Sequence, residues 1–253
     1  MKEKIEKLHK DVKERFQKEK FPQLKISLFE NHSELISSDK TAFFPYGYGL
    51  WNSNQKSKTT IMVLGQDFGN DDSWIIANSR GEKDQPTLKN LKYMISEFSS
   101  AIEIEGLYKC FFTNCYFGLR INNTKSTGPF LNQILKGIKG NKRKKFKNKF
   151  IEISKSIFQK QLDFIKPSKI LILGKEPAFF ISEKFKLMDW SRYDNGEERT
   201  LKSMIRMNSI IKKPPYQLYL IPHPSNWKLY CINNKSDKIL NQIENTIEKC
   251  FLK

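Results

Sequence analysis

The sequence predicts an α/β fold in which helices cover both faces of a mostly parallel β-sheet. Short apolar runs bounded by glycine, proline or polar residues recur along the chain, as expected for strands buried on both faces. Longer stretches between them carry apolar residues at spacings of three and four, which is typical of amphipathic helices. This alternation indicates βαβ units with right-handed connections.

Four segments carry the strand pattern. Each is short, is dominated by apolar residues and ends in glycine, asparagine or a proline-bounded turn. They are TTIMVLG (59–65), YKCFFTN (108–114), KILILG (169–174) and the strand within YQLYLIPHPS (216–225). We expect these segments to form the sheet.

The helix pattern appears before, between and after these strands. Residues 1–20 have apolar side chains on one helical face, and Pro22 ends the segment. Thr87 can cap a helix over about 88–101. A basic run, KGIKGNKRKKFKNKF (136–150), leads into a long helix. The remaining helices are expected over 150–165, from about Glu176, and over roughly 236–251.

Composition points to a polyanionic partner. The 253 residues include 45 lysines and arginines against 27 aspartates and glutamates, a formal net charge of +18. Such an excess favours nucleic acid ahead of a membrane surface, and the alternative is a protein that is merely rich in lysine. No run of eighteen apolar residues is present, and the charged N-terminus lacks the apolar core of a signal peptide. We expect a cytoplasmic monomer that binds DNA and not a membrane.

The chain reads as one domain over residues 1–253, with residues 1–42 as an N-terminal helical extension packed on it, because no repeat or flexible linker interrupts it. Its four cysteines form no CxxC pair, which argues against a zinc or iron–sulfur site. A disulfide framework would be unusual in a chain of this size without a secretion signal. Cys110 and Cys115 flank an apolar run and are expected to be buried free thiols.

Polar residues follow the predicted strands where a ligand would bind. In an open parallel sheet, ligands bind outside the carboxyl ends of the strands. Asp67 follows the first strand, Asn114 ends the second, and His223 follows the fourth between two prolines that each fix φ. An acid, an amide and an imidazole are therefore expected on one edge of the sheet.

Each of these residues also has a structural interpretation. Asp67 could cap a helix or form an Asx turn. Asn114 could occupy the left-handed region at a strand end. His223 could be a partly buried histidine with satisfied hydrogen bonds. Their convergence on one edge favours a functional site over these separate explanations.

Two of the motifs together resemble a known family. LGQDFGN (64–70) with IPHPSNW (221–227) resembles the two signature motifs of the uracil-DNA glycosylase superfamily, which read GQDPY and HPS. PTLKNL (86–91), FFTN (111–114) and KPSKILILGKEP (166–177) are similar to further segments of that family, in the same order. The resemblance spans about Phe44 to Trp227.

This resemblance implies a three-layer α/β/α sandwich around a four-stranded parallel sheet. It also implies hydrolysis of the N-glycosidic bond of a base flipped out of DNA, without metal or organic cofactor. Asp67 matches the acid that stabilises the sugar cation and positions water. His223 matches the imidazole that donates to uracil O2, and Asn114 matches the amide that contacts N3 and O4.

The sequence departs from the family's pattern around the base and the DNA. Phe68 and Gly69 replace Pro-Tyr, whose tyrosine excludes the thymine methyl, so uracil, hypoxanthine, xanthine and mismatched thymine all stay open as substrates. Phe68 and Trp74 are both candidates to stack on the base. The base-binding set is Gln66, Phe68, Gly69, Asn114 and Trp74.

The expected DNA contacts come from three places. Pro86 and Thr87 at a helix start, and Ser225 after the histidine, can hold phosphates. Trp227 stands where the family has a Pro-Leu wedge, or it packs as ordinary core. The basic run adds Lys142, Arg143 and Lys144, unless it is a solvated mobile loop. The second hypothesis for function is a nucleic-acid-binding protein on this fold that has lost catalysis.

Overall fold

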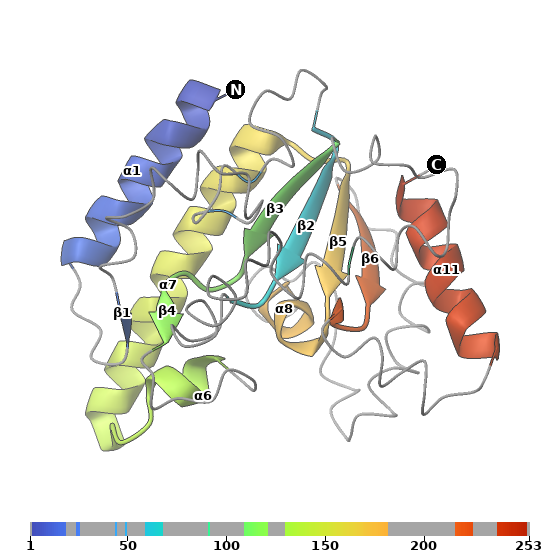
Figure 1. The fold of residues 1–253 in the computed structure, drawn as a ribbon. Coiled ribbons are helices and arrows are strands. Elements are labelled where there is room, and N and C mark those ends of the chain that lie inside the picture. The colour runs from blue at the N-terminus through green and yellow to red at the C-terminus, as the bar shows by residue number, and fades with distance from the viewer. Residues whose placement is uncertain are drawn as a thin grey trace, which may run out of the picture.

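A four-stranded parallel β-sheet forms the centre of the molecule (Figure 1). Its order is β3–β2–β5–β6, and every pairing is parallel. The strands are β2 (Ile61–Gly65), β3 (Cys110–Asn114), β5 (Lys169–Leu173) and β6 (Gln217–Ile221). The computed structural model describes residues 2–18, 24–25, 44, 49, 59–67, 91, 109–120, 130–181, 216–224 and 237–251. All four predicted strands and the α/β class are confirmed.

The central strands are buried on both faces. Met62 and Leu64 of β2 belong to the large core cluster on the side of α7 (Gly140–Ile165), and Ile61 and Val63, which alternate with them, are equally buried. The strands therefore have no polar face, as the continuous apolar runs of the sequence predict for a parallel sheet.

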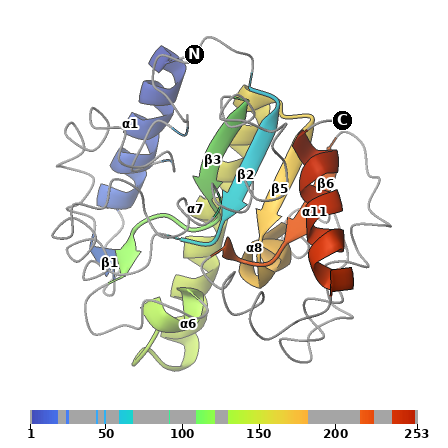
Figure 2. The ribbon, with the colours of Figure 1, turned by 45° about the vertical axis from the view of Figure 1, so that its right-hand side comes forward.

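Helix α7 covers one face of the sheet, and α1 (Lys2–Lys18) packs against it (Figure 2). The Asp11 carboxylate lies 2.8 Å from Lys160 Nζ, and Arg15 Nη1 donates to Ser156 Oγ over 2.8 Å. The apolar face of α1 joins the core through its buried side chains, which are Ile5, Leu8 and Val12. This docking confirms the amphipathic helix predicted at the N-terminus.

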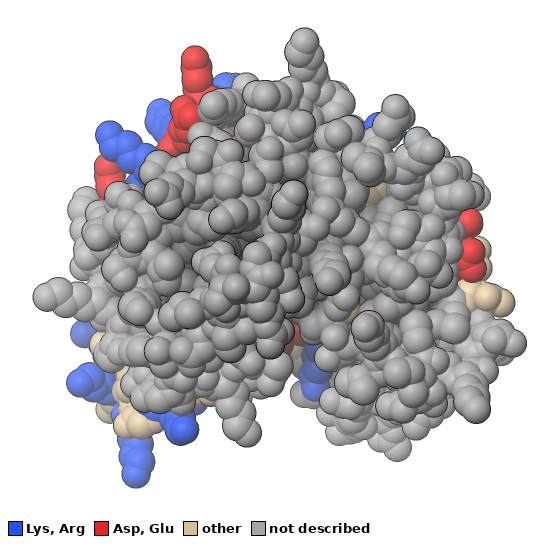
Figure 3. Space-filling view, viewed as in Figure 1, with Lys and Arg blue, Asp and Glu red and all other residues tan. Residues whose placement is uncertain are grey.

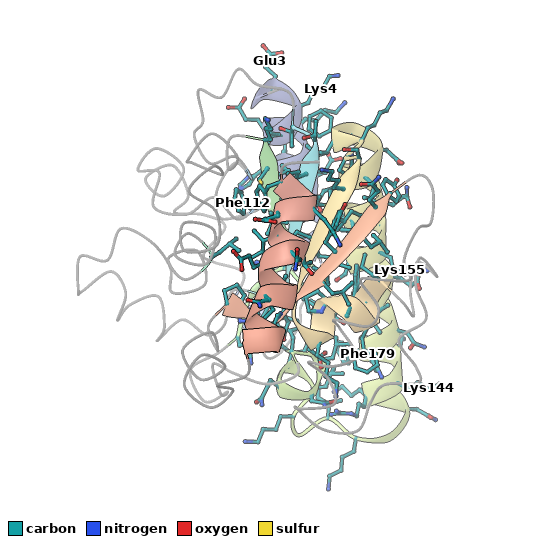
Figure 4. The ribbon with its side chains drawn as sticks, turned by 90° about the vertical axis from the view of Figure 1, so that its right-hand side faces the viewer. Glu3, Lys4, Phe112, Lys144, Lys155 and Phe179 are labelled. Atoms are coloured by element: carbon teal, nitrogen blue, oxygen red, sulfur yellow. The ribbon has the colours of Figure 1, made fainter. Side chains whose placement is uncertain are left out.

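Helix α11 (Asp237–Phe251) lies on the opposite side of the strands from α7 (Figure 4). It buries Ile243 and Ile247 beside β6. Lys169 Nζ donates to the backbone oxygen of Cys250 over 2.8 Å, which ties the C-terminal end of α11 to the start of β5. The helix predicted over 236–251 is confirmed, and the three layers form an α/β/α sandwich.

A second, two-stranded ribbon lies beside the main sheet. It pairs β1 (Leu24–Lys25) with β4 (Leu119–Arg120) in antiparallel orientation, and Leu24 stands opposite Arg120. Strands of two residues leave no periodic pattern in a sequence, so this ribbon was not predicted.

The basic run is helical, contrary to the expectation that it precedes the helix. Gly140–Phe150 forms the first turns of the 26-residue α7, and the alternative of a loop is wrong for these residues. Lysine and arginine are good helix formers, but only Phe146 and Phe150 mark an apolar face in this part of the sequence, which is too few for a clear helical period. Upstream, the short helix α6 (Phe130–Ile134) was not predicted from the sequence either.

No helix in the described ranges is long and apolar enough to cross a membrane. Cys110, Cys115 and Cys250 are buried free thiols, which confirms the expectation for the first two. Cys231 lies outside the described residues.

Candidate active site at the carboxyl edge of the sheet

Asp67 is positioned by the end of β2 and by the segment that follows β3. Gly65 pairs with Asn114 in the sheet. The parallel pattern then continues beyond both strands, because Cys115 N donates to Gly65 O over 2.9 Å and Tyr116 N donates to Gln66 O over 3.0 Å. Gln66 and Asp67 are thereby held beside the residues that follow Asn114.

The Asp67 carboxylate forms a buried ion pair with Arg120, the last residue of β4. Arg120 Nε donates to Asp67 Oδ2 over 2.9 Å, and Nη2 donates to Oδ1 over 3.1 Å. Only 1% of the Arg120 side chain and 5% of the Asp67 side chain are exposed. The geometry is bidentate, which is the strongest arrangement of these two groups. Sequence reasoning missed this partner.

Aromatic residues support the guanidinium of Arg120. Its Cζ lies 5.7 Å from the centroid of the Phe130 ring, within the range of a cation–π contact. The Phe130 ring stacks in turn on Tyr116, with centroids 5.1 Å apart. Because Phe130 is fully buried, the guanidinium end of the ion pair lies against the aromatic core.

Asn114 is the last residue of β3 and is 3% exposed. Its backbone is not in the left-handed region, because Lys166 is the only non-glycine residue with positive φ among those described. The interpretation of Asn114 as a left-handed strand terminus is therefore wrong. Its amide lies at the same edge as Asp67, one strand away.

His223 follows β6 and packs against the end of β5. Gly174 N donates to Ile221 O over 2.8 Å, which joins the two strand ends. Gly174 has φ of +87°, and a Cβ on it would lie 3.0 Å from the Cβ of His223. A glycine is needed there for both its backbone angle and its size. Burial lowers the pKa of His223 to about 4, so the imidazole is neutral at pH 7.

Asp67 and His223 stand about two strand spacings apart along this edge. Because β5 separates β2 from β6, Asp67 and His223 project from strands about 10 Å apart. Asn114 lies beyond Asp67, on β3.

Two further ionisable residues, Cys115 and Glu176, lie at this edge of the sheet. Burial raises the pKa of the Cys115 thiol well above its usual value, and the carboxylates of Glu176 and Asp67 raise it further. Cys115 is therefore a protonated, inert thiol and no nucleophile. Glu176 lies in α8 (Lys175–Phe179), the short helix that directly follows β5.

Several predicted site residues lie outside the described residues. The stacking candidates, the phosphate-gripping positions and the wedge position are not placed, so these predictions stay open. They are Phe68, Gly69, Trp74, Pro86, Thr87, Ser225 and Trp227.

The basic residues lie at the start of α7, where two of the three are exposed. Lys142 and Lys144 face solvent, and Figure 3 shows Lys and Arg side chains gathered where α6 and α7 begin. Arg143 instead folds back onto the turn after α6, where it donates to the backbone oxygens of Leu135 and Ile138. Arg143 thus stabilises a helix end, a role that the sequence did not indicate.

This basic end faces the same way as the carboxyl edge of the sheet. Helix α7 runs antiparallel to β5, into which its C-terminal end leads, so its N-terminal end projects past the carboxyl ends of the strands (Figure 1). The first turn of α7 contains no acidic residue, and its N-cap residue, Lys139, makes no side-chain capping bond. The positive helix dipole adds to the lysine charges there.

Within the described part of the chain, no three His, Cys, Asp or Glu side chains are grouped so that they could hold a metal ion. A scan against protein-family models finds no match to the chain, and a search of curated proteins finds none either.

Proposed function

We propose that this protein is a DNA glycosylase that hydrolyses the N-glycosidic bond of uracil or a related deaminated base. The observation that carries the proposal is the placement of Asp67, Asn114 and His223 at the carboxyl ends of three strands of one parallel sheet. This is the edge where such sheets bind ligands. The resemblance of the surrounding motifs to the uracil-DNA glycosylase superfamily supports the same assignment.

The properties of His223 suit a hydrogen-bond donor to the leaving base. Cleavage of the glycosidic bond leaves negative charge on the base and positive charge on the sugar. A donor that is already fixed in place stabilises the developing anion without reorganisation. The imidazole is neutral at pH 7 and is held between Pro222 and Pro224. In this mechanism it stabilises the anion through an N–H and transfers no proton.

Asn114 and Asp67 suit the two other tasks. The amide of Asn114 offers both a donor and an acceptor, which can read the N3 and O4 edge of uracil and reject cytosine. The Asp67 carboxylate accepts hydrogen bonds from water and faces the cationic sugar. A base held between Asp67 and His223 brings its glycosidic bond within reach of both.

The exposed lysines of α7 suit contact with the DNA backbone. Lys142 and Lys144 project at the end of the molecule that carries the site, and the chain's net charge is +18. Phosphate contacts from such residues give sequence-independent affinity that falls with salt. We propose that they hold the duplex while one nucleotide is extruded, and that the protein acts as an intracellular monomer.

The second candidate is a nucleic-acid-binding protein that has lost catalysis. The observation that favours it is the Asp67–Arg120 pair, because a carboxylate beside a buried guanidinium stabilises a sugar cation less than an isolated carboxylate does.

One assay separates the two candidates. Purified protein is incubated with oligonucleotides that carry uracil, hypoxanthine, xanthine or a G·T mismatch, each as a single strand and as a duplex. Alkali-labile abasic sites are then scored, with Asp67→Asn, purified in parallel, as the control for contaminating activity. We expect abasic sites from at least one deaminated base with the natural protein alone. Salt-sensitive DNA binding with no abasic sites from any substrate would favour the second candidate.

A further inference from the structure

Arg120 is an unusual neighbour for a carboxylate that acts on water. It is among the largest fully buried side chains of the described residues, and its guanidinium contacts Asp67 through two nitrogen atoms. The ionised carboxylate accepts about four hydrogen bonds in total, so this pairing uses only part of its capacity. The two contacts fix the plane of the carboxylate and so the direction in which its oxygen atoms accept hydrogen bonds.

The protein holds Arg120 from several sides. Its backbone belongs to β4, which pairs with β1 of the N-terminal extension. Its guanidinium carbon lies over the ring of Phe130, which is itself stacked on Tyr116. A guanidinium fixed at both backbone and side chain is a rigid support for the group that it contacts. The N-terminal extension is thus connected to the candidate site through one strand pairing.

The pairing changes what Asp67 can contribute. The net charge of the pair is zero, so attraction of a sugar cation by Asp67 alone is weakened. The direction in which its oxygen atoms accept hydrogen bonds remains, and Arg120 controls that direction. A role in orienting water depends on the planar fork of arginine, whereas a role in balancing charge would be met equally by lysine.

We propose that Arg120 is a positioning residue that orients the Asp67 carboxylate, so that Asp67 acts by directing the attacking water onto the sugar. The inference rests on the proposed glycosylase function. In this inference Asp67 touches water and substrate, and Arg120 acts only through Asp67.

The test removes the planar guanidinium of Arg120 and keeps its positive charge. Arg120→Lys keeps the positive charge and loses the bidentate geometry. We expect its single-turnover rate to fall by about tenfold to a hundredfold, with little change in the Kd for DNA, because small displacements of a reacting group have effects of this size. Arg15→Lys is the matched control, since Arg15 makes an exposed hydrogen bond to Ser156 of α7 and none to Asp67. It should retain the natural rate.

A double-mutant cycle separates positioning from general damage. Arg120→Lys is also introduced into Asp67→Asn, whose residual rate is measured with excess enzyme. If Arg120 acts only through Asp67, the second substitution changes this residual rate by less than about twofold, because the two effects are not additive. A variant that is merely damaged loses rate in both backgrounds.

Phe130→Leu keeps the test decisive if Arg120→Lys does not fold. It removes the aromatic support of the guanidinium and leaves the ion pair itself in place. We expect a smaller fall in rate that again disappears in the Asp67→Asn background.

The outcomes distinguish the two proposals. Natural protein that releases no base from any substrate overturns the glycosylase function and this inference with it. An active protein in which Arg120→Lys, or Phe130→Leu in its place, keeps the natural rate overturns the inference alone. So does a loss of the same size in the natural and Asp67→Asn backgrounds.

Discussion

The candidate site has one half at the end of β2, with Asp67, and another at the end of β6, with His223. The two halves differ in the charge state of their buried group. After β2, Asp67 is paired with a guanidinium whose nearest nitrogen lies 2.8 Å from its Oδ2. After β6, burial lowers the pKa of His223 to about 4, and the imidazole is neutral at pH 7. The Asp67–Arg120 pair is buried with both groups charged, whereas His223 is buried in its neutral form.

This difference follows from what each side chain can do in a low-dielectric environment. A buried charge must be paired and hydrogen-bonded, or the group changes its protonation state. The ends of β5 and β6 are held by stereochemistry, through Gly174 and the prolines on either side of His223. The end of β2 is held by electrostatics. The two halves should therefore fail under different perturbations.

The largest expected loss of stability comes from removing one partner of the Asp67–Arg120 ion pair. Arg120→Met leaves Asp67 buried without its counter-charge, and the free energy of unfolding should fall by about 3–5 kcal/mol. In the double variant Asp67→Leu/Arg120→Met the unpaired charge is gone, and most of the loss should be recovered. Urea unfolding followed by circular dichroism measures both. A double variant no more stable than Arg120→Met would show that the pair is not the source of the loss.

The next largest expected effect is a pH dependence of stability that comes from His223. The folded-state pKa of His223, about 4, lies below its unfolded value of 6.5, so the unfolded chain binds the proton more tightly. Its contribution to stability is complete above pH 6.5 and is lost as the pH falls towards 4, by up to about 3 kcal/mol. His223→Gln should remove this part of the slope in urea unfolding between pH 4 and pH 7.5. An unchanged slope would contradict the pKa.

A comparison of two glycines tests how far backbone geometry and close packing hold the end of β5 beside His223. Gly174 and Gly137 both have positive φ, but a Cβ at Gly137 would meet nothing within 4 Å. Gly137→Ala should therefore lower the free energy of unfolding by about 1–2 kcal/mol through backbone strain alone. Gly174→Ala should lose at least about 1 kcal/mol more, because its φ of +87° and ψ of −173° lie in a region essentially restricted to glycine and its Cβ would also meet His223. Equal losses in the two variants would contradict both the backbone angles and the contact at Gly174.

The smallest effect concerns charges that stay in water. Lys142→Gln/Lys144→Gln should reduce the slope of log affinity for duplex DNA against log salt by about 2. The free energy of unfolding should rise by about 0.3–1 kcal/mol, because cations at a helix N-terminus oppose the helix dipole. The control is Lys7→Gln/Lys10→Gln, the same charge change on exposed residues of α1. An equal change of slope in the control would indicate a diffuse charge effect.

The sheet and its polar edge could be predicted because they follow from local pattern. Apolar runs of strand length gave β2, β3, β5 and β6, and the residue after each run was then known to lie at the ligand-binding edge. Asp67, Asn114 and His223 were found in this way. The long amphipathic helices were found through their apolar period.

The ion pair could not be predicted in the same way. Arg120 lies 53 residues from Asp67 in the sequence, and no period connects them. The only available signal is that Arg120 directly follows the apolar CYFGL segment, where a charged side chain would need a buried partner. The helical start of α7 was missed because the residues of 140–150 are mostly basic or polar, and only Phe146 and Phe150 continue the apolar face of the helix.

The β1–β4 ribbon gives the molecule an uneven resistance to local opening. β5 is hydrogen-bonded to strands on both sides, whereas β1 and β4 pair over two positions only. Amide hydrogens of β5 should exchange with solvent only when the whole domain unfolds, and those of the ribbon should exchange through smaller openings of lower free energy. Such an opening would loosen the backbone of Arg120 while the sheet stays intact. The support of Asp67 would then be lost at temperatures well below the melting of the core.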